Sequence, residues 1–477
     1  MIAPDWAFAP AIDQAEAIRR KEVRPIELLE LYYRRISQIN PKLNAYVLLT
    51  EDLARSQAEA AEHRLLRAED PGRLGGVPIS IKETASLAGY RASLASKAFE
   101  QVKANVDGFP IGRLKAEGAV ILGKTNAPEF GTRPVTEGPL FPPARNPYDR
   151  SRTAGGSTGG GGAAVASGLC ALAQGGDGGG SIRIPAACCG VVGLKPSRGR
   201  ISSGPILGED WAGLVTAGVL ARNVADSALG LDSMAGHLPG DPYWADQEGS
   251  FLEAARKEPG PLRVGWTATC RTAVDTEQIE ATVRAAQRLE AAGHQVFEAT
   301  VDLAQFSDII QTLAVVGVGS LPIKDPAVLD PLNAAMFRLA PSIKAVDYLK
   351  AITRMHIQAR QLVAHWDTMD VLLTPTLTGP AVRIGELGQT VDTAGEEFRD
   401  WLSFLYPFNC TGQPAISIPA GLSESGLPLA VQLVGRPHDE YTILSLATQL
   451  ESLLGVLPRP PEMWSSPVEA TETVNAG

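Results

Sequence analysis

Residues 155–185 read GGSTGGGGAAVASGLCALAQGGDGGGSIRIP and contain two glycine-rich turns, each of which carries a serine, Ser157 and Ser181. Fourteen glycines lie between Gly155 and Gly193, in a chain that has 48 glycines among 477 residues. This short segment therefore accounts for most of the glycine excess over an ordinary protein. Because glycine lacks a side chain, it allows tight turns and close approach of the backbone to a ligand.

Short apolar segments alternate with amphipathic ones on both sides of this stretch. Apolar runs bounded by turn residues predict strands at 77–81, 119–122, 371–373 and 415–418. Apolar residues at helical spacing predict helices at 26–39, 52–68, 111–117, 224–234 and 276–291. Strands that alternate with helices indicate an α/β protein with a central sheet covered by helices.

The composition excludes several classes of protein. Hydrophobic residues make up 44% of the chain and charged residues 20%, which is enough apolar surface for a large core. No apolar run approaches the ~18 residues of a membrane-spanning helix. The N-terminus, with Asp5 and Asp13 and no basic start, does not have the pattern of a secretory signal. The net charge of −10 disfavours general nucleic-acid binding.

The chain has five cysteines, a small and odd number for its length. Cys188 and Cys189 are adjacent, a spacing that fits neither a metal site nor a disulfide framework. We therefore expect a reduced, cytoplasmic protein with buried thiols and no metal. The five residues are Cys170, Cys188, Cys189, Cys270 and Cys410.

Residues 118–125, GAVILGKT, match the phosphate-binding pattern G-x-x-x-x-G-K-[ST]. That pattern needs a flexible loop followed by a helix. Here the middle residues are Ala, Val, Ile and Leu, which favour a buried strand, and Pro128 follows where the helix should continue. We interpret the match as coincidental.

The first turn also matches G-x-S-x-G, the nucleophile elbow of α/β-hydrolases, with Ser157 at its centre. An elbow needs an apolar strand directly before it, but residues 145–152 are polar and contain Pro147. It also needs a histidine partner, and no histidine has a distinctive setting among His237, His294, His356, His365 and His438.

The other possibility is a serine hydrolase without histidine. Ser181 follows Gly178–Gly180, whose amides can approach a carbonyl oxygen and form an oxyanion hole. Lys82 follows the predicted strand 77–81, where burial would lower its pKa toward that of a usable base. Ser157 could relay a proton between them. Each residue alone has an ordinary structural interpretation; the combination points to acyl transfer.

These segments together resemble the amidase-signature family. The resemblance rests on residues 155–196 and on Gly76-Val-Pro-Ile-Ser-Ile-Lys82, Leu122-Gly-Lys-Thr-Asn126, Val371-Leu-Leu-Thr-Pro-Thr376 and Thr411-Gly-Gln-Pro-Ala415, with Phe408-Asn and Val431-Gln432. Similar segments run from about residue 25 to 455, and the match is weaker between 240 and 365. The segment that matches the phosphate-binding pattern is one of the family's own motifs.

The resemblance implies a set of site residues and no cofactor. Ser181 would be the nucleophile, Ser157 the bridging serine in a cis peptide bond, and Lys82 the terminal base. The amides of Gly178, Gly179 and Gly180 would hold the oxyanion. Three further residues would support the site: Thr158, Asp177 and Arg183.

The resemblance also implies one α/β domain with a mixed, twisted sheet of about eleven strands and helices on both faces. Within it we expect an N-terminal helical segment (1–70), a core with the catalytic residues (71–235), a variable region with a lid over the substrate pocket (236–365), a C-terminal part of the same domain (366–460) and a tail (461–477).

Some positions depart from the usual family pattern. Thr158 replaces the second serine of a Ser-Ser pair, Glu83 replaces the aspartate after the lysine, and Gly176 and Gly178 replace threonines. The resulting Asp-Gly-Gly-Gly-Ser form is more similar to the aryl-acylamidase and cyclic nylon-oligomer hydrolase branch.

We therefore expect hydrolysis of an apolar acyl or aryl amide, with carbamate (urethane) or ester bonds as further substrates. The least similar segment, 313–348, would line the acyl pocket with Met336 and Phe337, and Phe130 would contribute from the core; simple core packing explains these side chains equally well. The rival function is the glutamine-hydrolysing subunit of a tRNA-dependent amidotransferase. We expect a monomer or homodimer that acts on a small molecule, without nucleic-acid or membrane partners.

Overall fold

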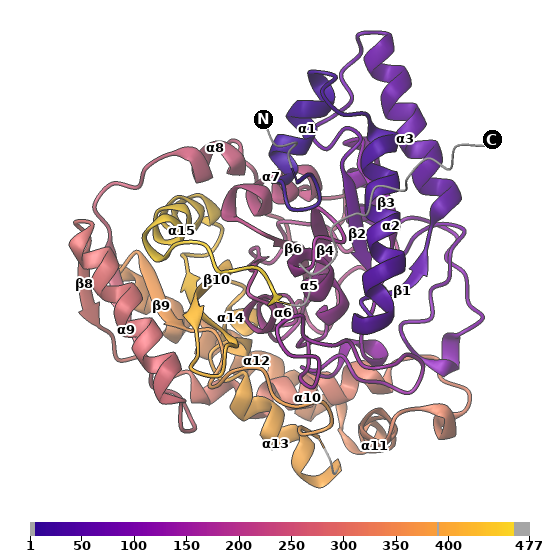
Figure 1. Ribbon diagram of the computed structural model, residues 1–477. Coiled ribbons are helices and arrows are strands. Elements are labelled where there is room, and N and C mark those ends of the chain that lie inside the picture. The colour runs from indigo at the N-terminus through magenta and orange to yellow at the C-terminus, as the bar shows by residue number, and fades with distance from the viewer. Residues whose placement is uncertain (1–4, 389–390, 462–477) are drawn as a thin grey trace, which may run out of the picture.

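The computed structural model describes residues 5–388 and 391–461. Its centre is a mixed sheet of 11 strands, which confirms the predicted α/β fold (Figure 1). From one edge to the other the strands are β1 (Tyr46–Leu49), β3 (Val120–Thr125), β2 (Pro78–Lys82), β4 (Leu172–Asp177), β6 (Thr216–Ala221), β5 (Val192–Lys195), β10 (Ala415–Leu422), β11 (Pro428–Val434), β9 (Val371–Pro375), β7 (Arg263–Trp266) and β8 (Gln295–Glu298).

Strand direction places two site residues at the same end of neighbouring strands. β2 runs parallel to both β3 and β4, and Ser80 of β2 lies opposite Ala173 of β4. Because parallel strands end on the same side, Lys82 at the end of β2 and Asp177 at the end of β4 lie near each other. The strands from β4 through β6, β5, β10 and β11 to β9 pair antiparallel.

Side chains alternate between the two faces of the sheet and fill two hydrophobic cores. In β3, for example, Val120 and Leu122 belong to one core and Ile121 to the other. Apolar residues of α5 (Gly159–Ala166), α6 (Arg183–Cys189), α10 (Ser307–Gly319), α11 (Pro331–Leu339), α13 (Val391–Trp401) and α14 (Tyr406–Thr411) contribute to the first core. The second core includes residues of α1 (Ala11–Arg19), α4 (Phe109–Ala116), α7 (Val224–Met234), α8 (Phe251–Arg256), α9 (Thr276–Ala291) and α15 (Glu440–Leu454).

Helix boundaries follow local capping chemistry. The predicted helices 224–234 and 276–291 form with those bounds as α7 and α9, because Asn223 and Asp275 accept hydrogen bonds from the first free backbone amides of each helix. Two further predicted helices form near the N-terminus as α2 (Pro25–Leu43) and α3 (Glu51–Leu66).

The segment that matches the phosphate-binding pattern is a strand, as its apolar residues predicted. Gly123 and Lys124 lie within β3, paired with β1 on one side and β2 on the other. The Lys124 ammonium is buried and lies 2.9 Å from the Glu83 carboxylate. Its charge is therefore neutralised by Glu83 within the protein. Residues 120–125 form a strand and not the loop that a nucleotide phosphate requires.

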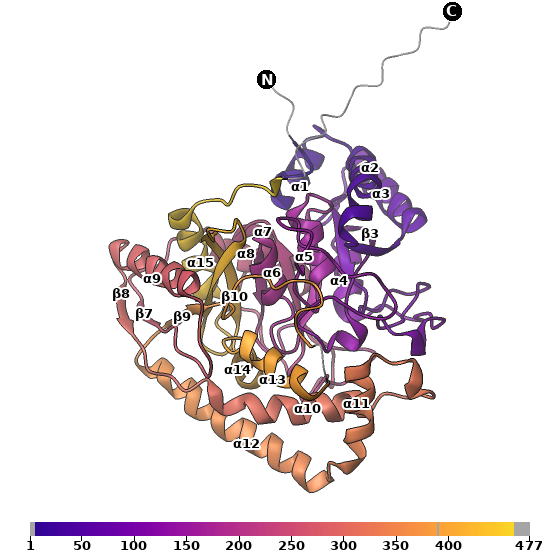
Figure 2. The same ribbon diagram turned by 60° about the horizontal axis from the view of Figure 1, so that its bottom comes forward.

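The helices between β8 and β9 form an arm on one side of the molecule (Figure 2). This arm, residues 307–363, contains α10, a short 3₁₀ turn η4 (Pro326–Val328), α11 and α12 (Ala345–Val363). It includes the whole of the segment 313–348, for which the sequence resemblance is weakest. It lies close to the end of β4, since Ile310 Cδ1 of α10 is 3.3 Å from the Cβ position of Gly179.

Two sequence expectations concern cysteines and membranes. All five cysteines lie within the described residues and are free, and four of them are buried. In the described ranges, no helix has both the length and the apolar character that crossing a bilayer requires. The predicted tail lies outside the described residues from position 462 onward.

Candidate active site

Lys82 ends β2 with its side chain almost fully buried, at 5% exposure. Its Nζ donates a hydrogen bond of 2.7 Å to Ser157 Oγ and one of 3.3 Å to the Gly176 carbonyl. Burial lowers the pKa of Lys82 to about 8, although the charges of Asp177 and Asp210 oppose this effect. A substantial neutral fraction therefore exists near physiological pH, as a general base requires.

Ser157 lies in the turn before α5, buried at 1% exposure, and the Gly156–Ser157 peptide bond is cis. No strand leads into this turn: residues 145–156 make only isolated bridges, such as Arg145 with Thr153. The side-chain partner of Ser157 is the lysine described above. The structure therefore lacks both the strand and the histidine contact that a nucleophile elbow needs.

Ser181 lies between the end of β4 and the start of α6, with 9% of its surface exposed. The backbone amide of Thr158 donates a 3.1 Å hydrogen bond to the Ser181 carbonyl, which joins the two glycine-rich turns. The Thr158 hydroxyl in turn donates to the Gly176 carbonyl at 3.4 Å. The fold thus brings Lys82, Ser157 and Ser181 into one buried region.

The three glycines before Ser181 do not have equivalent roles. The amide of Gly180 donates a 2.7 Å hydrogen bond to Asp177 Oδ1, so an oxyanion would have to compete with this carboxylate for it. For the amides of Gly178 and Gly179 we find no acceptor within the described residues. These two amides remain candidates for the oxyanion hole.

Neighbouring side chains explain why glycines occupy these positions. A Cβ on Gly178 would lie 2.8 Å from Val215 Cγ2, and one on Gly180 would lie 2.5 Å from Leu405 Cδ1. Gly180 also has φ of +125°, which other residues rarely adopt. The threonine usual in the family at position 178 would therefore collide with Val215.

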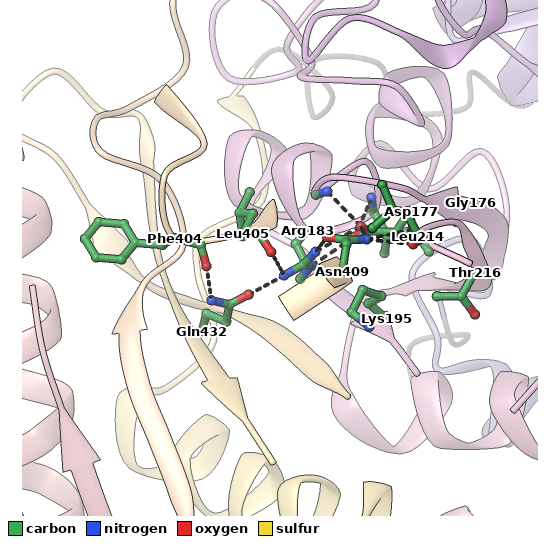
Figure 3. Close-up of polar contacts among 12 residues, drawn as sticks. Gly176, Asp177, Arg183, Lys195, Leu214, Thr216, Phe404, Leu405, Asn409 and Gln432 are labelled. Atoms are coloured by element: carbon green, nitrogen blue, oxygen red, sulfur yellow. Dashed lines mark hydrogen bonds and ion pairs between the residues drawn. The ribbon is translucent and has the colours of Figure 1, made fainter. Parts of the chain in front are cut away.

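Asp177 and Arg183 form a fully buried ion pair (Figure 3). Arg183 Nη2 lies 2.9 Å from Asp177 Oδ1, and Nε lies 3.0 Å from Oδ2. Burial alone would raise the pKa of Asp177, but the Arg183 charge and hydrogen bonds outweigh it and hold this pKa below its ordinary value. The carboxylate also accepts from the Ile182 amide, so it fixes the backbone on both sides of Ser181.

Two residues of the C-terminal part extend this network, and the sequence reasoning did not select them. Asn409 of α14 donates to Asp177 Oδ1 at 2.9 Å and accepts from Arg183 Nη2 at 2.6 Å. Gln432 of β11 accepts from Arg183 Nη1 at 2.7 Å (Figure 3). Both belong to family-like segments, Phe408-Asn and Val431-Gln432, and that was the available signal.

A second buried lysine lies near this network. Lys195, at the end of β5, is 1% exposed and donates to the Pro196 carbonyl at 2.9 Å. Burial and the charge of Arg183 lower the pKa of Lys195 to about 7, and the negative Asp177 acts in the opposite direction. Figure 3 shows Lys195 near the Asp177–Arg183 pair.

Apolar side chains surround the glycine loop. The nearest groups to Gly178, Gly179 and Gly180 include Val215, Ile310 and Leu405, which come from three separate parts of the chain. Ile310 lies on α10 of the arm, just before the segment that the sequence predicted as the pocket lining.

The predicted pocket residues lie in two places. Phe130 is half-buried in the turn beside Ser157 and stacks edge-on against Phe99 at 6.1 Å between ring centroids. Met336 and Phe337 are half-buried on α11, and Met336 packs against the first hydrophobic core.

A buried lysine–serine pair beside a glycine loop defines the class: this is an amidase, a hydrolase that acts on carbon–nitrogen bonds. The sequence model described as Amidase matches residues 27–444. The chain belongs to the amidase signature family, as the sequence resemblance indicated.

Individual relatives fall in the branch that the sequence suggested. The chain is 34% identical to 6-aminohexanoate-cyclic-dimer hydrolase of Paenarthrobacter ureafaciens, covering 96% of this chain and 97% of the relative. It matches the structure of 6-aminohexanoate cyclic dimer hydrolase complexed with substrate at 33% identity with a TM-score of 0.90, covering 96% and 100% of the two chains. A bacterial aryl acylamidase of the family matches at 28% identity with a TM-score of 0.87, covering 94% and 96%.

Proposed function

We propose that this amidase cleaves apolar acyl or aryl amides through a covalent acyl-enzyme on Ser181, with Ser157 and Lys82 as the proton relay. The observation that carries the proposal is the 2.7 Å hydrogen bond between Lys82 Nζ and Ser157 Oγ. It joins a desolvated base to a serine whose neighbour, Thr158, is hydrogen-bonded to the backbone of Ser181.

The first half of the reaction forms the acyl-enzyme. Neutral Lys82 accepts the proton of Ser157, Ser157 accepts the proton of Ser181, and Ser181 Oγ bonds to the amide carbon. The carbonyl oxygen becomes negative and is stabilised by the amides of Gly178 and Gly179. The carbon–nitrogen bond then breaks as the proton returns from Lys82 through Ser157 to the leaving amine.

The second half releases the acid. A water molecule takes the place of the amine and gives a proton through Ser157 to Lys82 while its oxygen bonds to the acyl carbon. Breakage of the ester bond returns the proton to Ser181 Oγ. Lys82 ends the cycle neutral, so no cofactor or co-reactant other than water is consumed.

The lining of the glycine loop supports an apolar acyl group. Val215, Ile310 and Leu405 lie against the three glycines and offer no charge to a substrate. The names of the relatives agree with this substrate class, since one is a 6-aminohexanoate-cyclic-dimer hydrolase and another is an aryl acylamidase. Carbamates and esters present the same carbonyl carbon to Ser181, so we include them in the proposed range.

A substrate panel tests the proposal. It contains an anilide, a linear alkyl amide, a cyclic amide oligomer, an aryl carbamate, an aryl ester and glutamine, each assayed with the parent and with Ser181→Ala. We expect turnover of the apolar amides by the parent and its loss in the variant. Turnover confined to glutamine would contradict the substrate class, and full activity of Ser181→Ala would contradict the mechanism.

A further inference from the structure

The arm makes its most buried polar contacts with a single turn of the core. This turn, Pro128–Arg133, contains the 3₁₀ segment η2 (Glu129–Gly131) and is called the Glu129 turn below. Asn333 of α11 is fully buried, and its Nδ2 donates to Glu129 Oε2 at 2.8 Å and to the Glu129 carbonyl at 3.3 Å. Its Oδ1 accepts from the Thr132 hydroxyl at 2.8 Å. All the polar atoms of this side chain are thus used between arm and turn.

Asp330, the residue before α11, adds a second set of bonds. Its backbone amide donates to Glu129 Oε2 at 2.9 Å. Its carboxylate accepts from Arg133 Nε at 2.7 Å and from Nη2 at 3.1 Å, in a two-pronged and largely buried ion pair. The same carboxylate caps α11, so the helix and the turn are fixed by one group.

The Glu129 carboxylate makes separation of arm and turn costly. It has no exposed surface, and burial raises its pKa. Of its three hydrogen-bond donors, Asn333 and the Asp330 amide come from the arm, and only the Ser96 hydroxyl, at 2.8 Å, comes from the core. Without the arm this carboxylate would lose two partners, which a buried charge tolerates poorly.

The Glu129 turn lies directly against the relay. Gly131 has φ of +71°, and a Cβ on it would lie 3.1 Å from Ser157 Oγ and 3.7 Å from Lys82 Nζ. The backbone of the turn therefore covers these two polar atoms. This cover contributes to the burial that lowers the pKa of Lys82.

We propose that Asn333 and Asp330 are positioning residues, which hold the Glu129 turn over Lys82 and Ser157 and so make the relay depend on the docked arm. This rests on the proposed roles of Lys82 and Ser157. Removal of the arm from the core would then admit water to the base.

The pH dependence of Ser181 labelling by a fluorophosphonate tests this without a known substrate. The probe reacts with the activated serine, so its rate should fall as Lys82 becomes protonated. In Asn333→Ala the loosened turn admits water, the pKa of Lys82 rises toward its ordinary value, and the acid limb moves to higher pH. A shift of one unit lowers the rate at pH 7 about tenfold. Asp177 and Asp210, the charges that act on Lys82, are unchanged.

Two further variants make the test decisive. Asp330→Asn keeps a helix-capping side chain but removes the charge opposite Arg133, so it should fold and shift the limb in the same direction. Asp325→Ala is the matched control, because Asp325 caps η4 of the same arm and is exposed. The pH profile of its labelling rate should match that of the parent. Folded Asn333→Ala and Asp330→Asn with the parent's profile would overturn the inference. Failure of the parent to label at Ser181 would instead overturn the proposed function.

Discussion

Lys82 Nζ and Ser157 Oγ lie 2.7 Å apart although 75 residues separate them in the chain. Lys82 is fixed by the end of β2 and Ser157 by the turn into α5, so the contact depends on the packing of α5 against the sheet. Because both groups are buried, the bond forms in a low-dielectric site where a lysine readily loses its proton.

Replacement of Lys82 should abolish catalysis without unfolding the protein. Lys82→Met keeps the length and apolar stem of the side chain but removes the base, and general-base catalysis contributes about 10²- to 10⁴-fold. We expect an anilide turnover at least about 10²-fold lower at neutral pH. The exposed Lys97, changed to Met, serves as the control and should retain the parent rate. Turnover of Lys82→Met within a few-fold of the parent would exclude this lysine as the base.

The activity should rise with pH through about 8. The relay needs neutral Lys82, and the neutral fraction grows as pH increases through the pKa of about 8. At pH 6 we therefore expect a kcat/KM about 100-fold below the high-pH plateau. Asp210 opposes the lowering of this pKa, so Asp210→Asn should move the limb to lower pH. Glu253→Gln, which removes an exposed carboxylate on α8, is the control and should leave the limb in place. A limb that moves upward in Asp210→Asn would contradict this electrostatic account.

A methyl group on Gly131 should impair catalysis far more than stability. Gly131→Ala would place a Cβ 3.1 Å from Ser157 Oγ at a residue with φ of +71°. Gly89→Ala is the control, because Gly89 has φ of +84° but no atom within 4 Å of its Cβ position. This variant has the backbone strain without the crowding. Both alanine variants should lose about 1 kcal/mol of stability from the left-handed conformation. Only Gly131→Ala should lower kcat, and equal activity in the two variants would show that the Gly131 turn does not control the relay.

The buried Asp177–Arg183 pair should be intolerant of a conservative change. Lysine cannot reproduce the forked contacts of Arg183 with Asp177, Asn409 and Gln432. Lysine keeps the charge but leaves some of these buried acceptors unpaired, at about 1–3 kcal/mol for each, so Arg183→Lys should show a markedly lower Tm. The exposed Arg67–Glu69 pair provides the control, since Arg67→Lys should change stability by less than about 1 kcal/mol. An unchanged Tm in Arg183→Lys would mean that this network does not stabilise the fold.

Local signals in the sequence were enough for several of the elements and for the choice of the proposed catalytic residues. The helices α7 and α9 follow from the helical spacing of their apolar residues. The apolar residues of 118–122 correctly predicted a strand in place of a phosphate loop. Lys82 stood out because a charged residue follows directly on a buried strand.

Contacts between distant segments could not be predicted from local sequence patterns. The Gly180 amide turns toward Asp177, and nothing in a run of three glycines distinguishes the one whose amide is already bonded. Asn333 and Asp330 contact the Glu129 turn from about 200 residues away, in the segment where the sequence resemblance is weakest. Their role depends on how the arm packs, which short-range patterns do not encode.

The most direct test of the central claim is the site of covalent labelling by a fluorophosphonate. After reaction at pH 8, digestion and mass spectrometry would locate the modified peptide, with Lys82→Met as the control for activation. The account predicts one adduct, on Ser181, which forms much more slowly in Lys82→Met. An adduct on Ser157, or labelling of Ser181 at the parent's rate without Lys82, would contradict it.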